Sequence, residues 1–210
     1  MKFLLLLFIL TFASPAYAED EGLYDPKVPD KAALVRFIHA DPHASESAFR
    51  LNNKKYDTLT FKDVSDYYVM PQGEAEVTIN KITKTKIFEA RTFYSVIKTP
   101  TDILILEDQP LEDITKALIT FYNLTPLESL TLATTEKNIT LVENLMPAQN
   151  AARAVNALTL NLTIINGNET TAIAEPVMLA RRSAHTILAL SDKDGTLTAV
   201  VTPSAIDTTK

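Results

Sequence analysis

Two short segments contain all the histidines of this chain, and both place them beside other reactive side chains. His39 and His43 flank Asp41 within the run His39-Ala40-Asp41-Pro42-His43, and two imidazoles with one carboxylate are ligands that suit a divalent metal ion. The Asp41–Pro42 step is also typical of a turn that follows a strand. No third histidine lies nearby, so the sequence favours the turn, and we expect no metal site.

Ser183 and His185 form the second segment. Residues two apart on a strand share a face, which would suit a serine nucleophile and its base. The sequence identifies no acidic third member, and no G-x-S-x-G motif occurs. We therefore interpret this pattern as a turn and the start of a strand.

Paired carboxylates could act on a glycosidic bond if they faced each other across a cleft. Three pairs occur, and each resembles solvated strand or turn positions: Glu74/Glu76, Glu112/Asp113 and Asp192/Asp194. The segment Asp192-Lys193-Asp194-Gly195 predicts a hairpin turn in which Gly195 has a positive φ. We predict no catalytic, cofactor-binding or metal-binding residue.

The composition supports this expectation. The 210 residues include Cys 0, Trp 0, His 3 and only Gly 4. Without cysteine there is no disulfide, thiolate zinc site or iron–sulfur cluster, and so few glycines leave little room for a phosphate-binding loop. A cofactor enzyme is disfavoured.

The first eighteen residues have the features of a secretory signal peptide. Lys2 precedes a short apolar run, and Ala16-Tyr17-Ala18 supplies the small residues of a cleavage site. We predict cleavage after Ala18, export to the periplasm and no transmembrane segment in the mature chain. The Asn-x-Thr triplets at Asn123, Asn138, Asn161 and Asn168 would be glycan acceptors in a eukaryote, but they arise easily by chance in a Thr-rich sequence.

The elements that must position these residues are strands. Short runs of alternating or β-branched residues recur, bounded by Asp, Asn, Pro or Gly. They are 34–39, 66–70, 74–79, 92–97 and 103–106, then 117–122, 129–133, 138–142, 157–165, 176–180, 185–190 and 196–201. The best helical candidate, Ala148 to Ala154, is short and would fit a loop as well. This spacing predicts an all-β protein of β-sandwich, immunoglobulin-like architecture.

The two halves of the chain resemble each other. Ala33 to His39 aligns with Ala117 to Asn123, and Phe88-Glu89-Ala90-Arg91 aligns with Leu179-Ala180-Arg181-Arg182. We infer two copies of a seven-strand unit. The predicted organisation is a signal peptide at 1–18, a first sandwich with an N-terminal leader at 19–110, and a second sandwich at 111–210.

Charge is unevenly distributed along the chain, whose net charge is −6. The segment 31–98 carries 11 basic and 8 acidic residues, between acidic segments at 19–30 and 99–115. Four basic residues in it are candidates to contact an acidic polysaccharide or partner: Lys81, Lys84, Lys86 and Arg91. The alternative is a solvated strand face. The overall sign and the predicted export disfavour nucleic acid.

Several motifs carry a resemblance to a known family. They are Gly22-Leu23-Tyr24-Asp25-Pro26, Met70-Pro71-Gln72-Gly73-Glu74, Tyr122-Asn123-Leu124 and Glu175 to Arg181, in this order along the mature chain. The sequence resembles the AlgF family of alginate biosynthesis and O-acetylation proteins. That resemblance implies a periplasmic, two-domain β protein that assists separate polysaccharide O-acetyltransferases. It supplies no catalytic motif.

Three hypotheses about function follow. The protein is an accessory that docks periplasmic acetyltransferases and holds polymer, an acetyltransferase or esterase in its own right, or a polysaccharide-binding module. We favour the first, without a cofactor.

Overall fold

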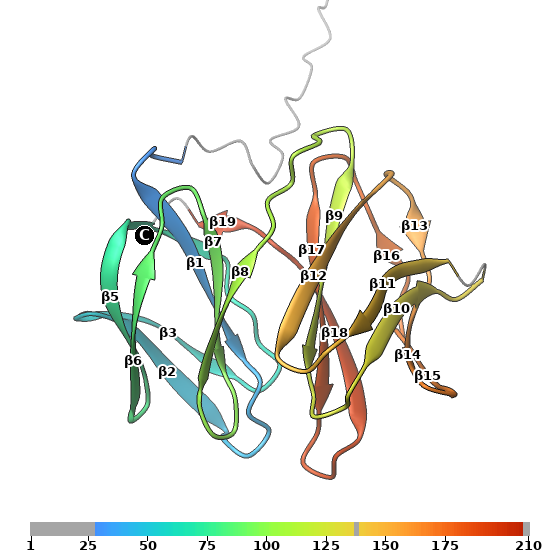
Figure 1. Ribbon diagram of the computed structural model, residues 1–210, viewed down its shortest axis with the longest axis horizontal. Coiled ribbons are helices and arrows are strands. Elements are labelled where there is room, and N and C mark those ends of the chain that lie inside the picture. Colours follow the sequence, from blue (N-terminus) through green and yellow to red (C-terminus); the bar gives the residue numbers. More distant parts are fainter. Residues whose placement is uncertain (1–27, 137–138, 208–210) are drawn as a thin grey trace, which may run out of the picture.

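The computed structural model describes residues 28–136 and 139–207, and all of its regular elements are β-strands. They form two sandwiches side by side (Figure 1). The predicted all-β class with two tandem sandwich domains is therefore confirmed. The predicted signal peptide, its cleavage site after Ala18, and Asn138 lie outside the described residues.

The first sandwich contributes four strands to its inner sheet and has an outer sheet of four strands. The inner sheet has the order β4 (Tyr67–Pro71), β1 (Ala32–His39), β7 (Phe93–Lys98), β8 (Ile103–Asp108). The outer sheet has the order β3 (Lys54–Thr60), β2 (Glu46–Leu51), β5 (Gly73–Ile79), β6 (Ile82–Phe88). Side chains such as Phe37, Val77 and Tyr94 fill the core between the two sheets.

The second sandwich repeats this plan. Its inner sheet is β12 (Gln149–Val155), β9 (Ala117–Leu124), β17 (Ala184–Ser191), β18 (Leu197–Pro203). Its outer sheet is β11 (Thr140–Leu145), β10 (Leu130–Thr134), β14 (Leu162–Asn166), β15 (Glu169–Ala172). A short extra pair, β13 (Thr159–Leu160) with β16 (Val177–Met178), lies beside it. Phe121, Leu132 and Ile187 lie in its core.

The internal duplication inferred from sequence is confirmed by the strand pairing. Apart from the extra pair β13 and β16, each unit has eight strands. The first of them is parallel to the seventh, which is β7 in the first unit and β17 in the second, and the other neighbours within the unit are antiparallel. Arg91 and Arg182, which occupy equivalent positions, both have φ near +60°. Arg91 donates its backbone N–H to the carbonyl of Ala32 at the start of β1, and Arg182 donates to the carbonyl of Lys116 just before β9. The shared unit has eight strands, so the predicted count of seven is wrong.

Several strands of the structure differ from the sequence prediction. The helical candidate Ala148 to Ala154 lies almost wholly in strand β12, which pairs along its whole length with β9. β2, β3 and β6 were not predicted, because exposed polar side chains interrupt their apolar pattern. A register shift in the pairing of β2 with β3 further breaks the alternation.

The two inner sheets pack back to back. Ile38 and Ile97 of the first sandwich form one buried cluster with Tyr122, Leu188 and Leu190 of the second. Every side chain of β1 is consequently buried, because one face meets its own core and the other meets the second sandwich. The last described strand, β19 (Ile206–Asp207), pairs in parallel with β4 of the first sandwich.

Candidate functional site

The four basic residues predicted to contact an acidic partner gather on and beside β6. Lys84 and Lys86 share the face of β6 that also carries Phe88. Lys84 Nζ lies 2.6 Å from Asp102 Oδ2, Lys86 Nζ lies 3.8 Å from Glu107 Oε1, and Arg91 Nη1 lies 3.8 Å from Asp30 Oδ1. Only Lys81 of the four has no ion pair within the described residues. The patch is largely neutralised by its neighbours, and its role in partner contact stays a prediction.

The segment around His39 is a buried polar cluster. Lys98 Nζ lies 2.9 Å from Asp41 Oδ2, and both side chains are almost fully buried. Asp41 also accepts a hydrogen bond from the backbone N–H of His43 at 3.0 Å, which forms the predicted turn. Within residues 28–136 and 139–207 no three His, Asp or Glu side chains are arranged to hold a metal ion.

His39 has a serine partner that sequence spacing did not suggest. Its Nε2 lies 3.0 Å from Ser47 Oγ, while its Nδ1 accepts the backbone N–H of Asp41 at 3.3 Å. The proton therefore resides on Nε2, and His39 donates to the serine hydroxyl instead of accepting its proton. Burial lowers the pKa of His39. A general base for Ser47 would need the opposite tautomer, so this pair fixes the end of β1 against β2.

Ser183 and His185 do not contact each other. Ser183 Oγ donates to the carbonyl of Ala180 at 2.8 Å, within the turn before β17. His185 lines a pocket instead, and burial lowers its pKa. The predicted hairpin turn at Asp192 to Gly195 is present, with φ of +84° at Gly195.

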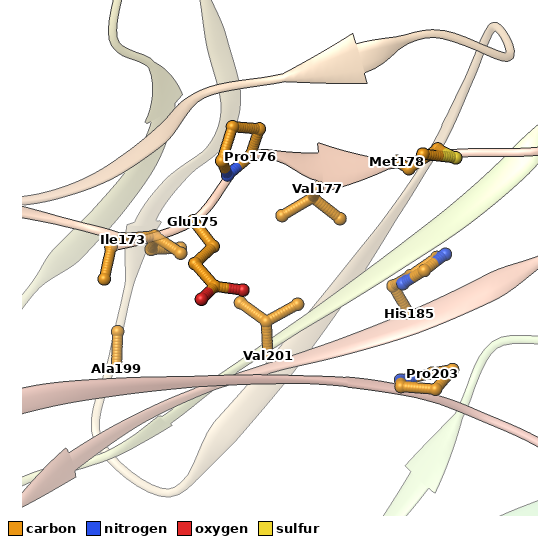
Figure 2. Close-up of a pocket in the computed structure, with 10 residues that line it drawn as sticks. Ile173, Glu175, Pro176, Val177, Met178, His185, Ala199, Val201 and Pro203 are labelled. Atoms are coloured by element: carbon orange, nitrogen blue, oxygen red, sulfur yellow. The ribbon is translucent and has the colours of Figure 1, made fainter.

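The pocket beside His185 lies in the second sandwich, between β18 and the segment that joins β15 to β16. It has a volume of about 390 Å³, a size typical of ligand sites. Figure 2 shows His185 and the carboxylate of Glu175 among Val177, Val201 and Pro203. Within the described residues, no hydrogen bond or ion pair engages the imidazole or this carboxylate. The pocket thus combines apolar walls with two polar groups that are available to a ligand.

A second polar site lies buried between the two sandwiches, centred on Arg36 of β1. Its guanidinium is fully buried and donates to Ser95 at 2.8 Å, to Thr186 at 2.5 Å, to Ser204 at 3.1 Å and to Tyr122 at 2.6 Å. Three of these four acceptors belong to the second half of the chain. Arg36 therefore ties the first sandwich to the second.

Asp108 supplies the opposite charge. Its Oδ2 lies 3.6 Å from Arg36 Nη2, and its carboxylate accepts hydrogen bonds from Tyr67 at 2.7 Å, Ser95 at 2.6 Å and Asn150 at 2.6 Å. A further, short hydrogen bond comes from the hydroxyl of Tyr122. Burial raises the pKa of Tyr122 and of Tyr67, so both hydroxyls keep their protons and act as donors.

The charge on Arg36 is held firmly despite burial. Desolvation alone would lower its pKa, but the neighbouring Tyr122, Tyr67 and Asp108 outweigh that cost and raise it above the ordinary value. The guanidinium also lies over the Tyr67 ring, 4.5 Å from its centroid. No buried side-chain polar atom of the described residues lacks a partner. The arrangement can fix the two sandwiches relative to each other.

Comparison with known proteins gives the family. A family model described as alginate O-acetyl transferase AlgF matches residues 5–186 of the chain. The chain belongs to the AlgF family. This confirms the resemblance found in the sequence.

Relatives within the AlgF family are distant in sequence. The chain is 25% identical over 170 residues to the alginate biosynthesis protein AlgF of Pseudomonas aeruginosa, across 80% of this chain and 77% of the relative. The AlgF protein of Pseudomonas putida is 25% identical over 166 residues, across 79% of this chain and 76% of the relative.

Solved AlgF domains from P. aeruginosa also align. The C-terminal domain covers 42% of this chain and 98% of its own length, with 27% identity and a TM-score of 0.38. The N-terminal domain covers 39% of this chain and 98% of its own length, with 14% identity and a TM-score of 0.35. In the described part of the chain, no helix is long and apolar enough to cross a membrane.

Proposed function

We propose that this AlgF-family protein is a non-catalytic accessory of polysaccharide O-acetylation in alginate biosynthesis. After export to the periplasm and cleavage behind Ala18, it docks periplasmic O-acetyltransferases and holds them near the exported polymer. The observation that carries the proposal is the family match over residues 5–186, together with relatives named as alginate biosynthesis proteins.

The architecture supports a docking role. The two inner sheets pack against each other, while strands of both outer sheets, such as β3 and β11, expose many of their side chains. Arg36 and Asp108 of the first sandwich hold the second through buried hydrogen bonds to Thr186, Tyr122 and Asn150. A rigid body with two outer faces suits a protein that holds two partners at a set separation.

Co-purification tests this proposal. The tagged full-length precursor is expressed in its own organism together with the periplasmic O-acetyltransferase encoded in the same operon, and the affinity-purified fraction is analysed by size exclusion. We expect a stable complex, and loss of polymer acetylation when the gene is deleted. Normal acetylation in the deletion strain, or clean separation of the two proteins at micromolar concentration, would overturn the proposal.

A second candidate, an acetyltransferase in its own right, is favoured by the description of the family model itself. The purified mature chain is incubated with a chromogenic acetyl ester at neutral pH. Turnover that disappears in a folded Ser183→Ala or Ser47→Ala protein would favour a serine nucleophile over the accessory proposal. Under the accessory proposal we expect no turnover above that of a heat-denatured sample.

A further inference from the structure

The pocket of the second sandwich exists because the two copies of the duplicated unit differ there. β1 pairs Val35 with Tyr94, and β9 pairs the equivalent Ile119 with His185. His185 therefore occupies the place of Tyr94. In the first unit Tyr94 is fully buried, stacks edge-on against Phe88 at 5.0 Å, and accepts the backbone N–H of Glu89.

The side chains of the neighbouring edge strand are also smaller in the second unit. Through the same register, Ile103 and Ile105 of β8 correspond to Ala199 and Val201 of β18. Phe88 corresponds to Leu179, which follows from the alignment of the two units. His185, Ala199 and Val201 line the pocket, and each is smaller than its counterpart in the first unit.

In the first unit, a lysine side chain covers the position that corresponds to the pocket. Lys86 extends from β6 over the ring of Tyr94, with Nζ 5.4 Å from the centroid, and pairs with Glu107 at 3.8 Å. The aliphatic stem of a lysine can cover apolar surface while its ammonium group stays near water. The outer strand is shorter in the second unit, since β15 has 4 residues where β6 has 7. Among the residues that the structure describes, no lysine lines the pocket of the second unit.

The pocket carries charge that suits such a side chain. Its titratable lining groups are Glu175 and His185, and burial lowers the pKa of His185, so the imidazole is neutral at pH 7 and the carboxylate leaves a net negative charge. A polyuronate, with a carboxylate on every sugar, would be repelled. Met178 extends the apolar surface at the pocket rim, where its side chain is 75% exposed.

We propose that this pocket docks an extended segment of a partner protein through a lysine or arginine side chain, which takes the place that Lys86 takes in the first sandwich. This inference rests on the proposed docking function and names the surface that serves it. The stem of the incoming side chain packs against Val177 and Val201, its charged group pairs with Glu175, and His185 offers a hydrogen bond.

A peptide titration tests the pocket without any natural partner. The probe is the acetylated, amidated heptapeptide Ile-Thr-Lys-Thr-Lys-Ile-Phe, which is the sequence of β6, and the control peptide carries glutamate at both lysine positions. The full mature chain is titrated while the imidazole signals of His185 and the methyl signals of Val177 and Val201 are followed by NMR. We expect saturable shifts with the basic peptide only. No shift, equal shifts with both peptides, or shifts with a mannuronate oligosaccharide instead would each overturn the proposal.

Two variants test whether the peptide binds in the pocket. Glu175→Lys changes an exposed side chain and should weaken peptide binding about tenfold. The double variant His185→Tyr with Ala199→Ile restores the residues of the first unit, so it should keep the thermal stability of the parent while filling the pocket and abolishing binding. Unchanged affinity in a folded Glu175→Lys protein would contradict the proposal.

The same variants separate this inference from the proposed function. If the parent chain binds the periplasmic O-acetyltransferase and both variants bind it equally well, the docking surface lies elsewhere and the accessory role stands. If the parent chain does not bind the acetyltransferase, the accessory role fails, and the peptide titration alone decides the pocket. At least tenfold weaker binding of the acetyltransferase by both variants supports the two together.

Discussion

Replacing Arg36 with methionine is expected to be among the most damaging single changes in this chain. The variant keeps an apolar stem of similar length but leaves Asp108 buried without its countercharge. The hydroxyls around Arg36 retain other partners, because Thr186 bonds Ser204 at 2.8 Å and Ser95 bonds Asp108 at 2.6 Å. The main cost is thus the uncompensated carboxylate, for which we expect a loss of about 3–5 kcal/mol in the free energy of unfolding.

Equilibrium urea denaturation, followed by far-UV circular dichroism and tyrosine fluorescence, measures this loss. The parent should unfold in one transition, because the two sandwiches share the buried cluster around Tyr122. In Arg36→Met we expect a lower midpoint and a separation into two transitions, since the contact between the sandwiches is weakened while each core is intact. Arg50→Met is the matched control, because Arg50 is exposed on β2, and it should change the free energy by less than ~0.5 kcal/mol.

A double-mutant cycle makes the reasoning refutable. Asp108→Asn alone should also destabilise, because it leaves the buried guanidinium unpaired. Arg36→Met combined with Asp108→Asn removes both charges, and it should cost at least ~2 kcal/mol less than the sum of the single changes. Additivity within ~0.5 kcal/mol, or a loss below ~1 kcal/mol in Arg36→Met, would show that Arg36 and Asp108 do not stabilise each other as a buried pair.

Three further outcomes are expected. Burial lowers the pKa of His39 below 6.5, so the unfolded chain binds more protons than the folded chain at a pH just below 6.5. The free energy of unfolding should therefore fall as the pH drops from 7 to 5. His39→Asn should reduce this fall in urea titrations at each pH, and an unchanged dependence of the free energy on pH would contradict the assignment. Lys84→Ala breaks an exposed ion pair and should change the unfolding free energy by less than ~1 kcal/mol in thermal melts, so a larger loss would show that the Asp102 pair is more than a surface contact. Mass spectrometry of the exported protein should find Glu19 as its first residue, and a chain that begins at Met1 would refute the cleavage site.

The His39→Asn change introduces a residue that the protein already uses in its second copy. Asn123 occupies the equivalent position in the second sandwich, where its Oδ1 accepts the backbone N–H of Thr125 at 3.1 Å. His39 Nδ1 accepts the backbone N–H of Asp41 in the same way. Asparagine should therefore preserve the turn after β1 while removing the titratable group.

The fold class was predictable because the core strands carry a clear pattern, whereas the polar outer strands do not. β12 differs from the prediction because it has no β-branched residue before Val155 at its end, yet it pairs fully with β9. Here pairing with a neighbouring strand decides the structure, in spite of weak intrinsic strand propensity.

One feature of the sequence indicates the buried site around Arg36. A charged residue stands inside the run Ala32–His39, which is otherwise almost wholly apolar. Such a strand is expected to be buried on both faces, and a buried charge needs a partner. The identity of that partner was beyond sequence reasoning, because Asp108 lies 72 positions away in a segment that the sequence presents as an acidic linker.

The duplication itself shows where each copy has taken on a separate task. Arg36 aligns with Thr120, and this single difference supplies the charge that joins the sandwiches. Tyr94 aligns with His185, which lines the pocket of the second sandwich. Most core positions, in contrast, keep apolar residues in both units, as Phe37 and Phe121 do. Positions where a duplicated protein departs from its own repeat therefore point to function more directly than any motif does. They predict that exchanging His185 for tyrosine will affect partner binding and leave folding intact.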